Sequence, residues 1–532
     1  MRYFFSRLRY CAQRRTVRRD PQLSRRLLFA SLFFVPLTLA PLSASGQWPR
    51  VENYRKDFLT IGSYTNITAI TSTNYYAYFA SANGILRYEI INKRWMEPLN
   101  YFGAFAGSEV YRLASSFDDE KLWAETNLGV FLYERLFGYW SEVNEFPAYE
   151  ISGETVRAEI VHTAPDGFSY FPDGSLLDRW GRQFYTDPIF RDRNGFLWMG
   201  LRGYGPARSE VDGGQLDLIP FGLLQTWVTA LVIVDGRLII GGRVDGSGRI
   251  GLTLLDRASG EFEYIEQGLE LNFPQVDVRS LGSSENSILV GSNLGLFEIN
   301  RRNREVTGYD RFSGLPHTQV NAAVGIGDTS LVGTQSGLAI LFQDSAGVKE
   351  VARQALGFTP IYCLEPAWPS PKRKVPLGPN VRPRHVWMGA ETGAYRIDMQ
   401  TLKLKKLSDP EGVLDSPVRH IKLVGANLWL LAENGLVRVG LQSGDVESYP
   451  EINRFQGHTA LAVNGQLVAV GTESGLTLFD YLKGGRITHR FTVNDGLVSN
   501  NITSLLFDGD YLWIGADLGL TRFWWNNPTR VY

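Results

Sequence analysis

Short stretches of alternating apolar and polar residues recur along most of the chain, and glycine-bearing turns separate them. The clearest copy is NNITSLLFDGDYLWIGADLGLTRF at residues 500–523. It contains an alternating stretch, a polar turn, an apolar run ending at Gly515, and a second glycine, Gly519, that opens another alternating stretch. Period-two patterning is typical of β-strands, because successive side chains of a strand point to opposite faces. Each copy therefore predicts three short strands.

The second glycine of the turn marks the copies along the chain. These markers are Gly84, Gly129, Gly205, Gly251, Gly295, Gly337, Gly393, Gly435, Gly475 and Gly519, and a degenerate copy, PDGFSYFPDGSLL, adds Gly174. Their mean spacing is about 43 residues, and a repeat of that length with four strand-like segments is typical of propeller blades. We therefore predict an all-β protein, a β-propeller of about eleven four-stranded units.

Eleven units exceed the roughly four to eight blades of a usual closed ring. An unclosed ring would expose unpaired backbone groups, so the count favours two rings, with one large ring as the alternative. Residues 228–532 contain about seven regular units, and residues 47–227 contain irregular ones, with the ring boundary left open.

The chain ends suggest how a ring closes. Val51 to Arg55 resemble outer strands such as Val306 to Asp310, whereas the last unit has too few residues after Trp525 for an outer strand. We therefore expect residues 50–56 to be the outer strand of a blade whose inner strands come from the last unit, or from the last unit of the first ring.

Each unit has a large side chain two positions before the first glycine of its turn, with Ala469 as the exception. These side chains are Tyr78, Trp123, Trp198, Ile239, Leu289, Leu331, Trp387, Trp429 and Trp513. We expect them to pack between adjacent blades, because a mid-strand tryptophan there buries a large area. A stacking platform for sugars is the alternative.

The first 46 residues have the layout of an export signal. An uncharged run from Leu27 to Leu42 follows Arg25-Arg26 and precedes four small residues. The run is shorter than the roughly 20 residues that span a bilayer. We predict that residues 1–46 are cleaved, with an uncleaved anchor as the alternative, and that the mature chain is periplasmic or secreted without a transmembrane segment. The arginine pair resembles a twin-arginine signal. The sequence does not decide between export by the Sec route and export by the twin-arginine route.

Nine arginines and one acid in this leader conceal a mildly acidic body, because the net charge of the whole chain is −1. Such a body argues against nucleic-acid binding. Cys11 lies in the leader and Cys363 stands alone, so the mature chain can form no internal disulfide and no cysteine-based metal site. We expect no cofactor, and the sequence leaves other metal binding undecided.

Acidic residues occupy the turn between the second and third strands in four consecutive units, at Glu391, Glu433, Glu473 and Asp517. Equivalent turns share one face around a propeller channel, so these carboxylates could bind a cation or sugar hydroxyls. Stabilisation of the turn itself is the alternative. His317, in the segment between two units, is the one histidine placed to line the channel, as a base or as a solvated loop residue.

An insertion at residues 364–384 holds six prolines and one acid, Glu365. Its cations are Lys372, Arg373, Lys374, Arg382 and Arg384. A proline-rich segment cannot pack as a strand, so we expect it to protrude, on the face opposite the acidic turns. A basic loop on an acidic body could dock a partner or an anionic polymer, and an idle insertion is the alternative.

The segment Asn494-Asp495-Gly496-Leu497, followed by Leu512-Trp513-Ile514-Gly515, resembles the two-component regulator propeller repeat, and Phe312 to Pro316 is similar. The resemblance covers residues 60–525. It implies the periplasmic sensing half of bacterial hybrid histidine kinases or a stand-alone secreted propeller, such as a surface component of type IX secretion. No kinase or output domain occurs in the sequence, so we expect no signalling in cis.

The common catalytic motifs HExxH, GxSxG, the phosphate loop and the EF-hand spacing do not occur in the sequence. We therefore predict an exported, non-enzymatic propeller of a bacterial envelope that binds a protein partner or a glycan. The alternatives are a propeller lyase or glycosidase, and an envelope sensor that acts in trans.

Overall fold

The computed structural model describes residues 54–99, 108–147, 153–156, 163–171, 173–210, 214–244, 249–268, 273–343, 349–368, 382–408, 412–433, 435–449, 452, 458–465, 467–481 and 486–528. The predicted export signal lies outside these residues. The described part contains strands β1 to β43 and two short 3-10 helices, η1 (Tyr54–Asp57) and η3 (Val413–Asp415), so the prediction of an all-β fold is confirmed. Among these residues no helix is long and apolar enough to cross a membrane.

Six four-stranded antiparallel sheets follow one another from Val228 onward, each built from consecutive strands. The first three are β17 (Val228–Val234), β18 (Arg237–Gly242), β19 (Gly251–Asp256) and β20 (Phe262–Glu266); β21 (Val278–Ser283), β22 (Ser287–Ser292), β23 (Leu296–Asn300) and β24 (Val306–Tyr309); β25 (Val320–Ile326), β26 (Thr329–Thr334), β27 (Gly337–Gln343) and β28 (Lys349–Ala355). The next three are β29 (Ile361–Pro366), β30 (His385–Ala390), β31 (Gly393–Asp398) and β32 (Leu404–Lys406); β33 (Val418–Val424), β34 (Asn427–Ala432), β35 (Gly435–Gly440) and β36 (Val446–Tyr449); β37 (His458–Val463), β38 (Leu467–Thr472), β39 (Gly475–Asp480) and β40 (Arg486–Phe491).

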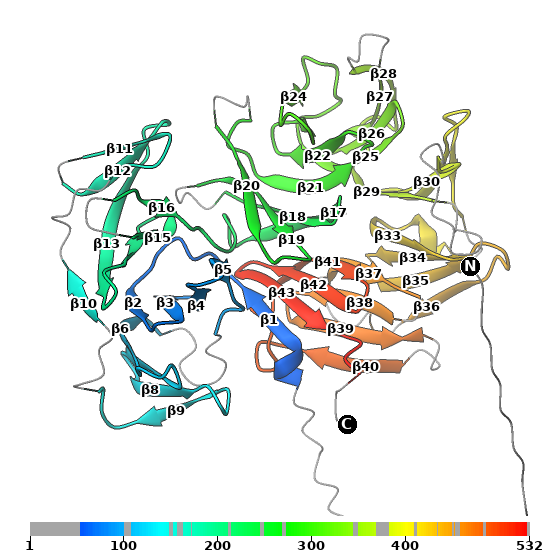
Figure 1. The fold of residues 1–532 in the computed structure, drawn as a ribbon. Helices are drawn as coiled ribbons and strands as arrows, with labels where there is room; N and C mark the ends of the chain where they lie inside the picture. The colour runs from blue at the N-terminus through cyan, green and yellow to red at the C-terminus, as the bar shows by residue number, and fades with distance from the viewer. Residues whose placement is uncertain are drawn as a thin grey trace, which may run out of the picture. The chain divides into compact units, whose positions relative to one another are not determined.

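The seventh sheet joins the two ends of the chain. Its strands are β41 (Ile502–Asp508), β42 (Tyr511–Ala516), β43 (Gly519–Trp524) and, as the outer strand, β1 (Phe58–Ile61). Figure 1 shows β1, in blue, beside β43, in red. The predicted closure is therefore confirmed, but the predicted strand at residues 50–56 is wrong. Residues 54–57 form η1, and the closing strand follows it, because Phe58 and Ile61 supply the apolar side chains that the last blade buries.

The first strands of these seven sheets are neighbours in cyclic order, from β17 through β21, β25, β29, β33 and β37 to β41, which contacts β17 again. The seven sheets are therefore the blades of one closed propeller ring, with the first strand of each blade innermost. Because this ring closes after seven blades, the chain does not form one large ring.

Three further sheets precede the ring in sequence. One contains β2 (Ala69–Ser72), β3 (Tyr76–Ser81), β4 (Gly84–Glu89) and β5 (Arg94–Trp95), and a second contains β6 (Val110–Ser115), β7 (Lys121–Thr126), β8 (Gly129–Glu134) and β9 (Tyr139–Val143). The third contains β10 (Gly153–Val156), β11 (Phe168–Tyr170), β12 (Ser175–Asp178), β13 (Gln183–Asp192), β14 (Leu197–Leu201), β15 (Gly205–Ser209) and β16 (Asp217–Leu218). The first strand β2 contacts both β6 and β13, which places its sheet between the other two.

The degenerate copy around Gly174 is not a separate blade, which corrects the predicted number of units. Its hairpin, β11–β12, pairs with the first half of β13, and the second half of β13 pairs with β14. The described residues thus form ten sheets. The sequence pattern of the hairpin is that of a blade turn, but its pairing partner belongs to the neighbouring unit.

The large side chains of the repeat fill the spaces within and between blades. Trp198 and Trp429 are fully buried, Trp387 and Trp513 are nearly so, and Ala469 is buried in the same position of its blade. Trp513 contacts a cluster that includes Val228 of the first blade and Ile61 of the closing strand. The prediction of packing is confirmed for these residues, whereas Trp123 is only half-buried.

Candidate functional site

The ring has two faces, because the four strands of each blade alternate in direction. We call one of them the channel face. It carries the first residues of the inner strands, the turns from the second to the third strands, and the links from each blade to the next. The opposite face carries the turns from first to second strands and from third to fourth strands.

Every inner strand of the ring has a β-bulge at its second residue. The bulge residues, in blade order, are Thr229, Arg279, Asn321, Tyr362, Arg419, Thr459 and Thr503. A bulge leaves one residue outside the strand pairing and redirects its side chain. All of these residues except Thr459 line a cavity of about 530 Å³, which lies at the centre of the channel face.

The rest of the lining comes from residues next to the bulges and from two turns. These are Arg243, Asp277, Val278, Gln335 and His420. Val278 is the one aliphatic residue among them, so the cavity is polar and hydrogen-bonding along most of its wall.

Four bulge residues have a structural task. The hydroxyls of Thr229, Thr459 and Thr503 each donate a hydrogen bond to the first backbone carbonyl of the next inner strand. The side-chain amide of Asn321 does the same, at 3.0 Å from the carbonyl oxygen of Ile361. These bonds tie neighbouring blades together beside the cavity.

The other three bulge residues, Arg279, Tyr362 and Arg419, make no such bond to a backbone carbonyl of the next inner strand within the described structure, and they depart from the repeat. Arg279 donates from Nε to Asn321 Oδ1 at 3.2 Å. The guanidinium of Arg419 lies over the Tyr362 ring, 4.1 Å from its centroid. The Tyr362 hydroxyl in turn donates a hydrogen bond to Glu391. Burial of the phenol and this carboxylate raise the pKa of Tyr362, so the hydroxyl stays protonated.

The positive charges of the cavity are incompletely neutralised. Arg243, Arg279 and Arg419 form no ion pair with any carboxylate of the described residues, and all three are exposed to solvent. The one acid of the lining, Asp277, accepts the Val244 backbone N–H at 2.9 Å through Oδ1. Partial desolvation lowers the pKa of Arg279, Asp277 raises it, and the like charge of Arg243 lowers it further, with a net decrease.

His420 lies beside Arg419 and is held neutral. Its Nε2–H donates to the backbone carbonyl of Thr459 at 2.9 Å. Burial of the ring, with smaller effects from the charges of Lys422 and Arg419, lowers the pKa of His420 to about 4. The neutral ring therefore supports the wall of the cavity rather than adding to its charge.

The four acidic turn residues lie on the channel face, but the structure does not gather them into one site. Glu391 accepts from Tyr362, and Asp517 accepts from the Asn501 side-chain amide at 3.1 Å. Glu433 and Glu473 are exposed in the turns of their own blades. None of the four lines the cavity.

His317 lies in the link between β24 and β25, outside the lining of the cavity. Its Nδ1 accepts the backbone N–H of Gln319 at 2.9 Å, which shapes the link. The described residues contain no group of three or more His, Cys, Asp or Glu side chains that could hold a metal ion. Burial raises the pKa of Cys363 to about 12, so its thiol is protonated at neutral pH.

The basic loop joins β29 to β30 and therefore leaves the ring on the opposite face. Lys372, Arg373 and Lys374 lie outside the described residues. Arg382 reaches Asp328, in the turn between β25 and β26, at 3.7 Å, with both side chains more than half exposed. Arg384 is the last residue before β30. The described ends of the insertion and the cavity thus lie on different faces of the ring.

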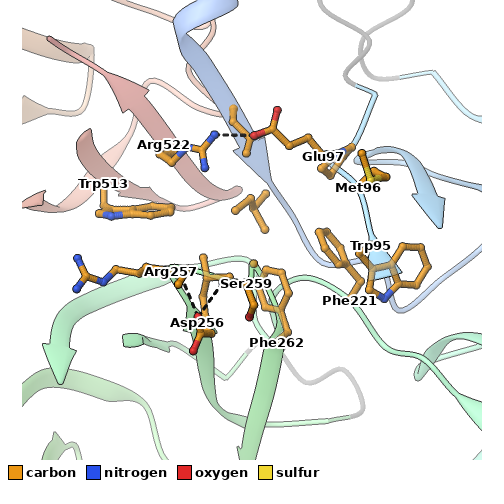
Figure 2. A pocket seen from close by; sticks show the side chains of 16 residues that line it. Trp95, Met96, Glu97, Phe221, Asp256, Arg257, Ser259, Phe262, Trp513 and Arg522 are labelled. Atoms are coloured by element: carbon orange, nitrogen blue, oxygen red, sulfur yellow. Dashed lines mark hydrogen bonds and ion pairs between the residues drawn. The ribbon is translucent and has the colours of Figure 1, made fainter. Parts of the chain in front are cut away.

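A second cavity, of about 250 Å³, lies where the sheet of β2–β5 meets the first and last blades of the ring. Figure 2 shows aromatic side chains around it, among them Trp95, Phe221 and Trp513. Its two arginines already have partners, because Arg522 pairs with Glu97 at 2.7 Å and Arg257 pairs with Asp508. Neither arginine of this cavity is therefore left without a carboxylate partner.

The sequence reasoning missed the arginines of the channel cavity. A signal was available in the position after the first residue of each inner strand, which reads Thr, Arg, Asn, Tyr, Arg, Thr, Thr around the ring. Comparing that position between blades separates Thr and Asn, which bond to the backbone carbonyl of the next inner strand, from Arg and Tyr, which do not in the part of the ring that the structure describes.

No protein-family model matches the chain, and no curated protein matches it. Among solved structures the chain is similar to the extracellular domain of BT4673 from B. thetaiotaomicron, described as a hybrid two-component system, with 15% sequence identity and a TM-score of 0.44. The match covers 88% of this chain but 64% of that one, so this chain spans just under two thirds of its length.

Two other similar structures come from different kinds of protein. PorZ, a surface component of the type-IX secretion system of Porphyromonas gingivalis, is 13% identical with a TM-score of 0.44, and the match covers 86% of this chain and 74% of PorZ. Virginiamycin B lyase from Staphylococcus aureus is 13% identical with a TM-score of 0.39, over 56% of this chain and 94% of the lyase. At these identities, what each neighbour binds or does is a property of that neighbour.

Proposed function

We propose that the protein is exported to the bacterial envelope and acts there by binding, with the channel face of the seven-blade ring as its binding surface. The partner is a glycan or a protein of the envelope or its surroundings. Export rests on the leader at residues 1–46. Binding rests on one observation: the bulge residue bonds to the first backbone carbonyl of the next inner strand in four blades, whereas Arg279, Tyr362 and Arg419 make other contacts at the cavity.

This departure supports a binding role because the other blades of the same ring show which residue the bulge position needs for structure alone. A threonine at the bulge satisfies the carbonyl of the next blade, and three blades use it. Replacing it by arginine gives up that bond to the carbonyl and places a charged group at the cavity, beside Asn321 for Arg279 and over the Tyr362 ring for Arg419. A convergent set of polar groups in a concave site is the usual character of a ligand site.

Exposed aromatic side chains on the same face support a surface that meets a partner. Phe312 is 100% exposed and Phe358 is 96% exposed, in the links that flank the blade of β25–β28. They are the two most exposed aromatic side chains of the described residues, and aromatic side chains that become buried on binding anchor many interfaces. Phe358 is moreover held at a φ of 65°, a backbone conformation that is costly for a bulky residue.

The cavity is arranged for holding a ligand rather than for acid–base chemistry. Its histidine is neutral and bonded to a backbone carbonyl, and its aspartate is bonded to a backbone N–H. One lining hydroxyl, that of Tyr362, is bonded to a carboxylate, Glu391, and its raised pKa keeps it protonated. An envelope sensor that acts in trans would use the same binding surface, so the proposal includes a sensor of this kind.

Co-sedimentation with isolated envelope fractions of the producing bacterium tests the proposal. We expect the parent protein to sediment with an envelope fraction and the Phe312→Asp/Phe358→Asp double variant to stay in solution. The matched control is Phe137→Asp, because Phe137 is 58% exposed and lies outside the ring. A parent that never sediments, or a double variant that sediments like the control, would contradict the proposal.

A further inference from the structure

We infer that the channel cavity binds an acidic saccharide, whose anionic group is held among the guanidinium groups of Arg243, Arg279 and Arg419. This inference rests on the proposed function and names the class of its ligand.

The charge of the cavity points to an anion. Three arginines and one aspartate line it, and Asp277 already accepts a backbone N–H. None of the three guanidinium groups forms an ion pair with a carboxylate of the described residues; the charge of Asp277 favours charged Arg279, and the like charge of Arg243 opposes it. A bound carboxylate or phosphate would relieve this repulsion and form charge-assisted hydrogen bonds, which are stronger than neutral ones.

Two of the three guanidinium groups stack on aromatic rings. Arg419 lies 4.1 Å from the centroid of the Tyr362 ring, and Arg243 lies 4.5 Å from that of Trp227. Stacking on an aromatic face restricts an arginine, and its planar guanidinium carries five N–H donors, more than one contact with Tyr362 can use. Arg279 is restrained on its other side by Asn321. A site arranged before binding loses less entropy when the ligand arrives.

The remainder of the wall favours a sugar over a peptide. Neutral amide and hydroxyl groups of Asn321, Gln335 and Thr229 adjoin the arginines, and Val278 is the single aliphatic residue of the lining. Groups that both donate and accept suit a ligand rich in hydroxyls, whereas an acidic peptide would also need apolar subsites for its side chains. A volume of about 530 Å³ is in the usual range of small-molecule sites and accommodates a short saccharide end rather than a folded domain.

The test is a calorimetric titration of the full chain at low salt with trigalacturonate and, as a neutral counterpart of the same shape, its methyl ester. We expect the free acid to bind at least tenfold more tightly than the ester and to weaken as salt rises. Mannose 6-phosphate, against mannose, distinguishes a phosphorylated source from a uronate source. Triglutamate tests the peptide reading.

The variants are Arg279→Thr and Arg419→Thr, which install the bulge residue of three other blades and should therefore leave the ring folded, as an unchanged Tm would verify. Each should weaken binding of the acidic saccharide at least tenfold. Arg302→Thr, an exchange of the same charge in the β23–β24 turn of the opposite face, should bind like the parent.

Three outcomes would overturn the inference: acidic and neutral saccharides binding alike, triglutamate binding as tightly as trigalacturonate, or both channel variants binding like the parent. Envelope co-sedimentation separates this failure from failure of the proposed function. The informative result is that Arg279→Thr/Arg419→Thr sediments like the parent while Phe312→Asp/Phe358→Asp does not. It would support the channel face as the binding surface and contradict an anionic ligand in the cavity.

Discussion

The hydroxyl of Thr503 donates a hydrogen bond to the backbone carbonyl of Val228, although the two residues are 275 positions apart in the chain. Thr503 is the second residue of the inner strand of the last blade, and Val228 is the first residue of the inner strand of the first blade. The same bond joins Thr459 to Ile502, whose blades follow each other in sequence. The junction between the ends of the ring is therefore built like its other junctions, and what distinguishes it is the strand β1 that completes the last blade.

Removing the closing strand should open the ring. A chain that begins at Tyr54 retains β1 and should unfold like the parent, whereas a chain that begins at Gly62 lacks it and should aggregate or unfold at a much lower temperature. Phe58→Ala should cost about 3–5 kcal/mol, because Phe58 is buried and stacks on Phe523 with ring centroids 4.4 Å apart. Urea unfolding measures this, with Phe312→Ala as the exposed control. A chain without residues 58–61 that folds normally would refute the closure.

Trp513→Ala should destabilise the ring by about 3–5 kcal/mol. Trp513 is 3% exposed and contacts residues of the first blade and of β1, so the exchange empties a buried site at the ring junction. Leu518→Ala, in a 56% exposed position of the same blade, is the control and should change the free energy of unfolding by less than about 1 kcal/mol. Equal unfolding curves for parent and Trp513→Ala would mean that the tryptophan has a role other than packing.

His420 should make stability dependent on pH between about 6.5 and 4. Its folded pKa of about 4 lies below the ordinary value, so the unfolded chain takes up the proton first as pH falls. Stability is complete above pH 6.5 and is lost towards pH 4, by at most about 1.4 kcal/mol per pH unit. His420→Gln, which can still donate to Thr459, should show a shallower loss over this window. His317→Gln is the matched exchange, and identical slopes for the parent and His420→Gln would contradict the assignment.

Millimolar calcium should leave the Tm unchanged. The acidic turns at Glu391, Glu433, Glu473 and Asp517 lie in four successive blades, and the described residues show no cluster that could hold an ion. A binding cation would stabilise the folded state by mass action. A rise in Tm with calcium that Glu433→Gln together with Glu473→Gln abolishes would show that these carboxylates form a cation site after all.

The strands of the blades were accessible from the sequence because their signals are local, whereas the closing strand was expected at residues 50–56 and lies at Phe58–Ile61. Alternation of apolar residues and the glycine of each turn fix where a strand begins, as at Gly519, where φ is 149° and an added Cβ would lie 2.7 Å from the Ile61 carbonyl. The eleventh unit was predicted wrongly because the hairpin around Gly174 has a blade-like turn, and only its pairing with β13 shows which sheet it joins.

The channel cavity was not accessible in the same way. Arg279 and Arg419 lie 140 residues apart, and nothing in either local sequence says that the two side chains line one cavity. That follows from the cyclic order of the blades and from the bulge that each inner strand carries. The acidic turns were predicted as a possible site because an acidic residue recurs in four successive blades. Such a recurrence is equally typical of residues that stabilise the turn itself.

Amide hydrogen exchange, with and without the envelope fraction that retains the protein, tests the channel face as the binding surface most directly. Binding should slow exchange in the links at residues 310–319 and 356–360 and at the starts of the inner strands around Arg279 and Arg419, while the turns of the opposite face at residues 425–426 and 509–510 stay unchanged. Protection confined to the opposite face, or no protection at the channel face in a sample that is bound, would contradict the account.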